Sequence, residues 1–340
     1  MAHGSWLVAV AAVLVACSGG DGSGNGTGGS SGVSGASGGA GAGGAGASSG
    51  SGGAIGGSGG ATGGSGGSTG GSGGGTTCPA APGSATAAQK TALSRVNAAR
   101  TAAGAKCARM VASLNTSTTK HCTYYSVNKS AGANQCIANP HNEVSGCKDY
   151  VAVNFWQRMQ AAGYSGAPAF EDMAFANNPT AAVAMWINSV WHRTPILSPW
   201  VVDVGYGKAA GCDTTDFGAG KGMAASTVVM WPYAGQTKVP RSFSGNEGPK
   251  PPAPPGGFPS GYPITLFAKG ASITSHTLTV AGNSTPISHQ WLTPAMQTLL
   301  KDAYVMYADK PLASKTKYRV TIKGTHTGGT LNKSWTFTTQ

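Results

Sequence analysis

Before residue 200, apolar positions recur with helical spacing in four segments. Residues 87–103 place Leu93 and Val96 on one face, and the segment stops at Gly104, a residue type that commonly ends helices. The last segment starts at Asn178, a good N-cap residue, with Pro179 at the first helical position. The pattern therefore predicts helices over residues 87–103, 117–128 and 148–162, and from 178 to the pair His192 and Arg193.

Beyond residue 200 the pattern changes to that of β-strands. Residues 201–208 and 223–231 are rich in β-branched and aromatic side chains, and residues 273–282 alternate between apolar and polar. In residues 317–322, Tyr318, Val320 and Ile322 fall on one face. Helices followed by strands with short connections predict an α/β domain built as a three-layer α/β/α sandwich, with an all-β sandwich after it.

A proline-rich stretch, PKPPAPPGGFPSGYP, separates these two parts and is typical of a semi-rigid spacer. Gly, Ser, Ala and Thr make up almost all of residues 18–77, a composition that predicts a disordered tether. The predicted organisation is a signal segment (1–17), the tether (18–77), an α/β domain (78–248), the spacer (249–263) and a β domain (264–340).

The start of the chain has the features of an export signal. Residues 6–16 form an apolar run of about 11 residues, which is the length of a signal-peptide core and too short to span a bilayer. The run ends in LVAC, the pattern of a bacterial lipoprotein cleavage site, which predicts lipidation of Cys17. The following Ser18 favours the outer membrane. The alternative is an ordinary cleaved signal, so the predicted protein is either a cell-surface lipoprotein or secreted.

The formal net charge of +12 arises because acidic residues are scarce, since charged residues make up only 10% of the chain. No basic run interleaved with aromatic residues is present, which argues against nucleic acid as a partner. Weak attraction to anionic envelope polymers or lipid head groups is an alternative to a simple role of this charge in solubility.

Six cysteines follow Cys17, all within one region and without a CxxC pair. An even number in an exported chain predicts three disulfides, although about 15 pairings are compatible with six cysteines. We expect Cys136 to pair with Cys147 and brace the loop that carries His141. The candidates are Cys78, Cys107, Cys122, Cys136, Cys147 and Cys212.

Several motifs, in order, resemble the CAP superfamily of cysteine-rich secretory, antigen 5 and pathogenesis-related 1 proteins. They cover about residues 86–232 and read VNAAR, KHCTYY, NPHNEV, AGYSGAPAFEDMAF and WINSVWHRTPILSP followed by DVGYG. By this resemblance, His141, Glu171 and His192 occupy three of the four cleft positions of the family. Ser189 stands where the fourth, acidic residue would fall, and Asp172 follows Glu171 where asparagine is frequent.

Two neutral imidazoles and a carboxylate can bind a divalent cation such as zinc, so His141 and His192 are candidate metal ligands. Glu143 lies two residues after His141 and can replace the missing acid; the alternative is a solvated residue or a partner of Arg193. We expect His121 to pack on its helix beside Tyr124 and Tyr125.

The end of the chain, KPLASKTKYRVTIKGTHTGGTLNKSWTFTTQ, resembles bacterial immunoglobulin-like domains, which implies adhesion or spacing. We expect His276, His289 and His326 to be surface residues, because they lack the spacing of metal ligands.

Three functions are therefore compatible with the sequence. The first is a non-enzymatic binding module for an envelope lipid, a glycan or a protein, which uses the cleft formed by the histidines and the glutamate. The second is a zinc-dependent hydrolase or peptidase that uses the same cleft. The third is a structural spacer or adhesin. A serine hydrolase that uses Ser189 and His192 is disfavoured, because the chain lacks a GxSxG turn and an acid placed to orient the imidazole.

Overall fold

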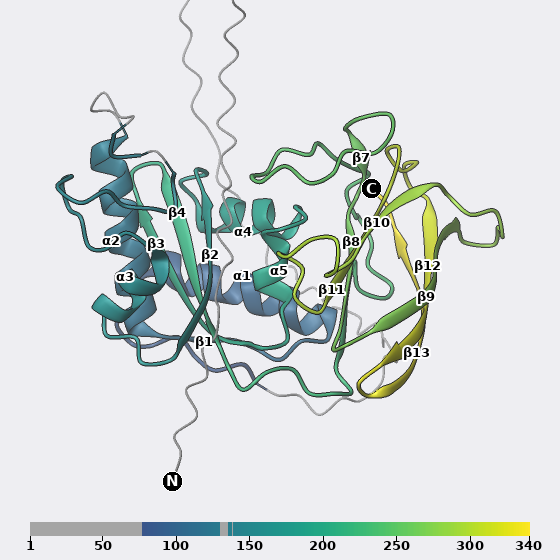
Figure 1. Cartoon of the computed structure of the whole chain (residues 1–340), viewed down its shortest axis with the longest axis horizontal. Coiled ribbons are helices and arrows are strands. Elements are labelled where there is room, and N and C mark those ends of the chain that lie inside the picture. The colour runs from purple at the N-terminus through teal and green to yellow at the C-terminus, as the bar shows by residue number, and fades with distance from the viewer. Residues whose placement is uncertain (1–76, 130–134, 138) are drawn as a thin grey trace, which may run out of the picture. The chain divides into compact units, whose positions relative to one another are not determined.

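The structure is a computed structural model that describes residues 77–129, 135–137 and 139–340. The predicted signal segment with Cys17, and the predicted tether up to residue 76, lie outside the described residues. The elements of the described part are drawn in Figure 1.

Helix α1 (Ala87–Ala103) has both of its predicted ends. Thr86 and Gln89 form a capping box, in which each side chain accepts a hydrogen bond from the other residue's backbone N–H. Gly104 ends the helix in the left-handed conformation, with φ 91°. On the buried side, the Arg100 guanidinium donates to the carbonyls of Ile196, Ser198 and Val201. These bonds attach α1 to the chain that leads into the central sheet.

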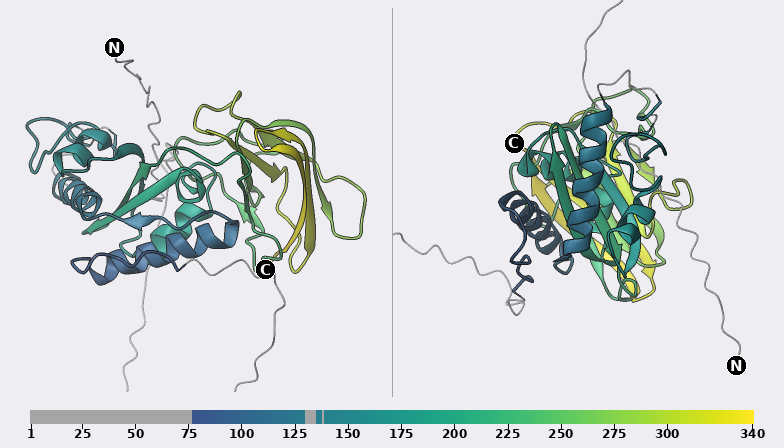
Figure 2. Two further views of the ribbon diagram at one scale, coloured as in Figure 1. Left: turned by 90° about the horizontal axis from the view of Figure 1, so that it is seen from below. Right: turned by 90° about the vertical axis from the view of Figure 1, so that its left-hand side faces the viewer.

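The first sheet has the strand order β1-β3-β4-β2. Strands β2, β3 and β4 pair antiparallel, whereas β1 pairs parallel with β3. Helix α2 lies along β3 and β4, and α1 packs against α4, α5 and β3 (Figure 2). The bounds are β1 Arg109–Met110, α2 Ala112–Asn128, α3 Phe155–Ala161, β2 Ala167–Ala174, α4 Pro179–Ile187, α5 Arg193–Leu197, β3 Val201–Ala209 and β4 Cys212–Ala219.

The close approach of α2 to the sheet depends on two glycines of β3. A Cβ atom added at Gly205 would lie 2.3 Å from the backbone of Leu114, and one at Gly207 would lie 2.2 Å from the backbone of Thr118. Real Cβ atoms do not tolerate such distances, so only glycine fits at these positions. The two glycines let the helix backbone rest directly on the strand.

Three of the predicted helices differ in extent. α2 begins at Ala112, five residues before the predicted start at 117. α3 covers only Phe155–Ala161, because Asp149 has a positive φ of 58° and Asn154 forms the N-terminal capping box with Gln157. Asn178 caps α4 as predicted, but the helix ends at Ile187 and a separate helix, α5, follows His192.

The second half of the described chain forms antiparallel sheets with the strand orders β10-β11-β8-β5 and β13-β12-β9, and a short pair of β6 with β7. β5 precedes the proline-rich stretch in the sequence but pairs with β8, which follows it. The bounds are β5 Val228–Trp231, β6 Ser242–Phe243, β7 Ser260–Gly261, β8 Ile264–Ala268, β9 Ser272–Val280, β10 His289–Leu292, β11 Ala303–Ala308, β12 Lys317–His326 and β13 Gly329–Thr338.

The predicted fold class, a three-layer α/β/α sandwich followed by an immunoglobulin-like sandwich, is wrong. The described residues are mostly β: their thirteen strands, in four sheets, contain more residues than their five helices. The prediction overestimated the helices, because residues 148–154 form exposed or half-buried irregular chain and 188–192 form irregular chain that packs against the core. It also assigned 223–231 to the first part, whereas this strand completes a sheet with β8.

Three disulfides brace the first half: Cys78–Cys107, Cys122–Cys212 and Cys136–Cys147. The last is the predicted pair and encloses the loop with His141. Three disulfides are compatible with an extracellular protein. Among the helices of the described residues, none combines the length and apolar character needed to cross a membrane.

The glycine contact leads to a stability prediction. Gly207→Ala should lower the free energy of unfolding by about 2 kcal/mol or more, because its Cβ forces α2 away from the sheet. Gly83→Ala is the control, since a Cβ there meets nothing within 4 Å. Denaturant unfolding measures both variants. Equal stability of the two would show that α2 does not rest on β3 as described.

Candidate functional site

His141 is held by a buried network on the side of β2 that faces α3. Its Nδ1 lies 2.9 Å from Oε1 of Glu171, and Oε2 of Glu171 accepts a hydrogen bond of 2.7 Å from Arg158. Arg158 also donates to the backbone carbonyl of His141. All three side chains are buried. The loop carrying His141, the strand carrying Glu171 and the helix carrying Arg158 therefore meet at one point.

The charges in this network support one another. Burial by itself raises the pKa of Glu171, but Arg158, His121 and His141 together outweigh it and hold that pKa below the usual range. Burial lowers the pKa of His141, which Glu171 opposes, while His121 and His192 lower it further. Glu171 is therefore a carboxylate, and it accepts a hydrogen bond from Nδ1 of His141.

Glu143 does not supply the missing acid. Its Oε1 lies 2.9 Å from Nδ1 of His121, and its Oε2 accepts from the backbone N–H of Val151 and Ala152. It is buried, so it is neither solvated nor a partner of Arg193. His121 also contacts the carbonyl of Pro140 through Nε2, which fixes the chain just before His141. Glu143 and His121 thus shape the loop of the first imidazole.

His192 has a different carboxylate partner, Glu247, which lies 55 residues later. Nδ1 of His192 is 3.0 Å from Oε2 of Glu247. The same carboxylate accepts from the backbone N–H of Val190 at 2.6 Å and of Trp191 at 2.8 Å. Glu247 thereby provides an acid beside the second imidazole, where the sequence has Ser189. Glu171 is not within hydrogen-bond distance of His192.

The two imidazoles share one unusual property. Nε2 of His141 and Nε2 of His192 are both buried, and neither has a hydrogen-bond partner among the described residues. In each ring Nδ1 faces a carboxylate, which fixes the proton on Nδ1 in the neutral ring and leaves a lone pair on Nε2. A buried hydrogen-bond acceptor without a partner destabilises the folded protein. A ligand group that donates a hydrogen bond to either Nε2 atom would remove this cost.

Two further carboxyl groups are buried nearby, Asp172 on β2 and Asp216 on β4. Neither oxygen of Asp172 has a hydrogen-bond partner in the described part of the chain, whereas Asp216 lies beside Ser117 and Glu171. Burial raises the pKa of Asp172 well above its usual range, and the charges of Glu247 and Glu171 add to this. Burial and Glu171 likewise raise the pKa of Asp216. Asp216 pairs with Glu171 across the strands, so both side chains lie on the same face.

Acidic residues are thus concentrated inside the protein. The chain has 11 in total, and seven of them are buried. The interior around the imidazoles is acidic, although the protein as a whole is strongly basic. The buried acidic residues are Glu143, Glu171, Asp172, Asp203, Asp213, Asp216 and Glu247.

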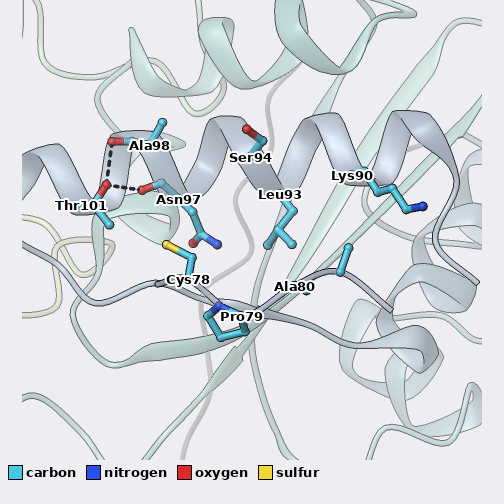
Figure 3. A pocket seen from close by; sticks show the side chains of 10 residues that line it. Cys78, Pro79, Ala80, Lys90, Leu93, Ser94, Asn97, Ala98 and Thr101 are labelled. Atoms are coloured by element: carbon cyan, nitrogen blue, oxygen red, sulfur yellow. Dashed lines mark hydrogen bonds between the residues drawn. The ribbon is translucent and has the colours of Figure 1, made fainter. Parts of the chain in front are cut away.

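A small cavity of about 40 Å³ lies beside His192 and is lined also by Ser189, Trp186, Met173 and Glu247. It can hold a water molecule or a small group. His141 does not line this cavity. A larger hollow of about 580 Å³ lies between residues 78–81 and the facing side of α1 (Figure 3). No imidazole or carboxylate lines it, so it is separate from the histidine network.

The residues do not form a complete set of metal ligands. Within the described part of the chain, no group of three or more His, Cys, Asp or Glu side chains is arranged to hold a metal ion. Nδ1 of His141 and Nδ1 of His192 are engaged by carboxylates, which leaves one nitrogen of each ring. Structural zinc sites have four protein ligands and catalytic sites three. The predicted zinc site thus has at most two of its protein ligands here.

Ser189 is not arranged as a nucleophile. Its hydroxyl donates to the carbonyl of Trp186 and lies 3.5 Å from Nδ1 of His192. Glu247 contacts that same ring nitrogen. In a catalytic triad the serine and the acid contact opposite nitrogens of the imidazole, so that one nitrogen takes the serine proton while the acid holds the N–H of the other. Here both groups contact Nδ1, so the ring cannot act as a general base toward Ser189 in this way.

Sequence reasoning missed Arg158 and Glu247 and assigned His121 to simple packing. Arg158 lies within the predicted helix 148–162, and no sequence motif singled it out. Glu247 precedes the proline-rich stretch, far from the motifs of the other cleft residues. Its only signal is that it is one of two acidic residues between 214 and 300. No protein-family model matches this chain, and no curated protein is significantly similar to it.

Removing the side chain of Glu247 should lower the stability of the protein strongly, although this residue lies in a loop. Glu247→Ala leaves two backbone N–H groups and His192 Nδ1 without partners, which should cost about 2–4 kcal/mol of stability. Glu247→Gln keeps one acceptor oxygen and should be intermediate. Asn246→Ala, at the exposed neighbouring residue, is the control. Thermal unfolding compares the variants, and a neutral Glu247→Ala would contradict the contact with His192.

Asp172 should make stability depend on pH. Burial raises the pKa of Asp172 in the folded protein above its value of about 3.9 in the unfolded chain. The stability that the protonated side chain contributes is therefore fully present below about pH 3.9 and is lost as pH rises through the folded pKa. Asp172→Asn removes this loss, so it should raise the melting temperature at neutral pH and change it little near pH 4. The control is Asp149→Asn, at an exposed residue. Destabilisation of Asp172→Asn at every pH would contradict a neutral Asp172.

Proposed function

We propose that this chain is an exported binding module that resembles the CAP superfamily and uses His141 and His192 to bind a polar ligand without catalysing a reaction. The observation that supports this proposal most is the pair of buried Nε2 atoms that have no partner among the described residues. Each ring is held from behind by a carboxylate, Glu171 or Glu247. Two preoriented acceptors of this kind are suited to binding and need no chemical step.

The chemistry of the site favours a ligand that donates hydrogen bonds. With the proton on Nδ1, each Nε2 accepts a hydrogen bond from a hydroxyl or amine. The carboxylates beside the two rings, Glu171 and Glu247, disfavour an anion in the same place. One hydroxyl or ammonium group of a glycan or an amine satisfies both conditions and is small enough for the cavity of about 40 Å³ beside His192. The buried Nε2 of His141 does not line this cavity, so its contact with a ligand requires the site to open.

The metal-dependent hydrolase remains the alternative. It requires a third protein ligand, which the described residues do not provide. The structural spacer is the third candidate and predicts no ligand at all. The three are distinguished by ligand binding, by metal content and by turnover of peptides, esters and glycans.

The location is part of the proposal. The LVAC pattern at Cys17, the Gly- and Ser-rich composition that follows and the disulfides support a lipoprotein attached to the bacterial envelope through a long tether. In this arrangement the lipid anchor is one partner and the ligand of the histidine site is another.

The test compares the wild type with the double variant His141→Ala/His192→Ala, with His326→Ala as the histidine control outside the site. A panel of neutral glycans, amino sugars and amine-bearing peptides is screened by thermal unfolding. At a ligand concentration 100 times Kd, binding stabilises the protein by about 2.7 kcal/mol. We expect at least one amino sugar or glycan to stabilise the wild type and His326→Ala but not the double variant.

If no probe stabilises the wild type, or if the double variant binds equally well, the proposed function is wrong. If the purified wild type carries stoichiometric zinc and turns over a substrate that the double variant does not, the hydrolase is correct instead.

A further inference from the structure

The outer face of the sheet β13-β12-β9 carries an ordered array of basic and hydroxyl side chains. Along β12, Tyr318, Val320 and Ile322 are buried in the core, and the alternating residues Lys317, Arg319, Thr321 and Lys323 point the other way. Arg319 and Lys323 are exposed. The three strands lie side by side, with β12 in the centre (Figure 1).

The neighbouring strands continue this face in register. Arg319 lies between Thr279 and Thr336, Thr321 between Thr277 and Ser334, and Lys323 between Ser275 and Asn332. The hydroxyls of Thr321 and Ser334 are 3.2 Å apart, which confirms that they share one side of the sheet. The face therefore consists of three rows that each run across three strands. Apolar side chains of β12 do not contribute to it.

No acidic residue occurs anywhere in β9, β12 or β13. Lys317, Arg319 and Lys323 form no ion pair with any described residue. This follows from the distribution of the acids, since seven of the 11 are buried. A rigid face with several uncompensated positive charges attracts anions.

We propose that this face binds an acidic polysaccharide. Arg319 and Lys323, with Lys317 at the end of the row, would pair with carboxylate or other anionic groups along the polymer. The flanking threonine, serine and asparagine side chains would exchange hydrogen bonds with its hydroxyls. At about 3.4 Å per residue along a strand, the three charges are spaced about 7 and 14 Å apart on one line. That line suits an extended polymer better than a compact ligand.

The composition of the face distinguishes this partner from a membrane. Surfaces that insert into lipid bilayers combine basic residues with aromatic or aliphatic side chains that enter the interface. The rows on this face contain only basic, hydroxyl and amide side chains. The head groups of an anionic bilayer would pair with the basic side chains but would leave the hydroxyl side chains without matching partners. An acidic polysaccharide offers anionic groups to the basic side chains and hydroxyls to the threonine, serine and asparagine side chains.

This interaction goes beyond the proposed function of the histidine site. The two proposed ligands differ in charge, because the histidine site favours hydrogen-bond donors and cations, whereas the β12 face favours anions. They also use different residues, so each can fail without the other.

The experiment uses the full mature chain with polygalacturonate, a polymer of uronic acid, as the probe and dextran as the neutral polymer. The variant Arg319→Glu/Lys323→Glu reverses two charges at exposed positions. The matched control, Lys90→Glu/Lys120→Glu, makes the same change in net charge at exposed positions of α1 and α2. Isothermal titration measures the affinity, and vesicles of phosphatidylglycerol form a third arm.

We expect the wild type to bind polygalacturonate but not dextran, and to bind it more weakly as salt increases. Arg319→Glu/Lys323→Glu should lose at least about tenfold in affinity, whereas the control should change less than about twofold. His141→Ala/His192→Ala should bind the polymer like the wild type. Lack of binding by the wild type, equal losses in both charge variants, or preference for the vesicles would each overturn the proposal.

Discussion

The ion pair between Arg158 and Glu171 is the interaction on which the histidine site depends. Both side chains are buried, and breaking such a pair from one side leaves an uncompensated charge in the interior. The pair keeps Glu171 ionised, and Glu171 in turn orients the ring of His141. Arg158 also holds the backbone carbonyl of His141. One guanidinium thus fixes the loop of His141 and, through Glu171, the orientation of its ring, and it keeps the carboxylate of Glu171 ionised.

The second imidazole repeats this principle with a carboxylate from a distant part of the chain. Glu247 reaches His192 together with the N–H groups of Val190 and Trp191, so the segment before the proline-rich stretch closes the site. Seven of the 11 acidic residues are buried, whereas the lysines and the arginine of β12 are exposed. This distribution is the common basis of the two proposals, a hydrogen-bond donor at the histidine site and an anion on the outer face of β12.

Local features could be predicted from the sequence, because short-range rules determine them. The capping residues of α1 and α4 and the alternation in β12 belong to this class. The pairing of Cys136 with Cys147 was also predicted, since the two cysteines flank one loop.

Long-range features could not be predicted, since no local signal specifies them. The pairing of β5 with β8 and the contact of Glu247 with His192 both join segments on either side of the proline-rich stretch. The fold class was wrong partly for the same reason, since residues 223–231 were assigned to the first domain although this strand pairs with β8. The short α3 has a local cause, the positive φ of Asp149 and the capping box at Asn154.

The central claim is that His141 and His192 are both held through Nδ1 by carboxylates and leave Nε2 free. Nitrogen-15 NMR of the histidine side chains in mildly alkaline buffer tests this directly, because protonated and unprotonated ring nitrogens have well separated shifts. We predict that Nδ1 carries the proton in both rings of the wild type, and that Glu247→Ala changes the signals of His192 alone. Protonated Nε2 in either ring of the wild type would contradict the account.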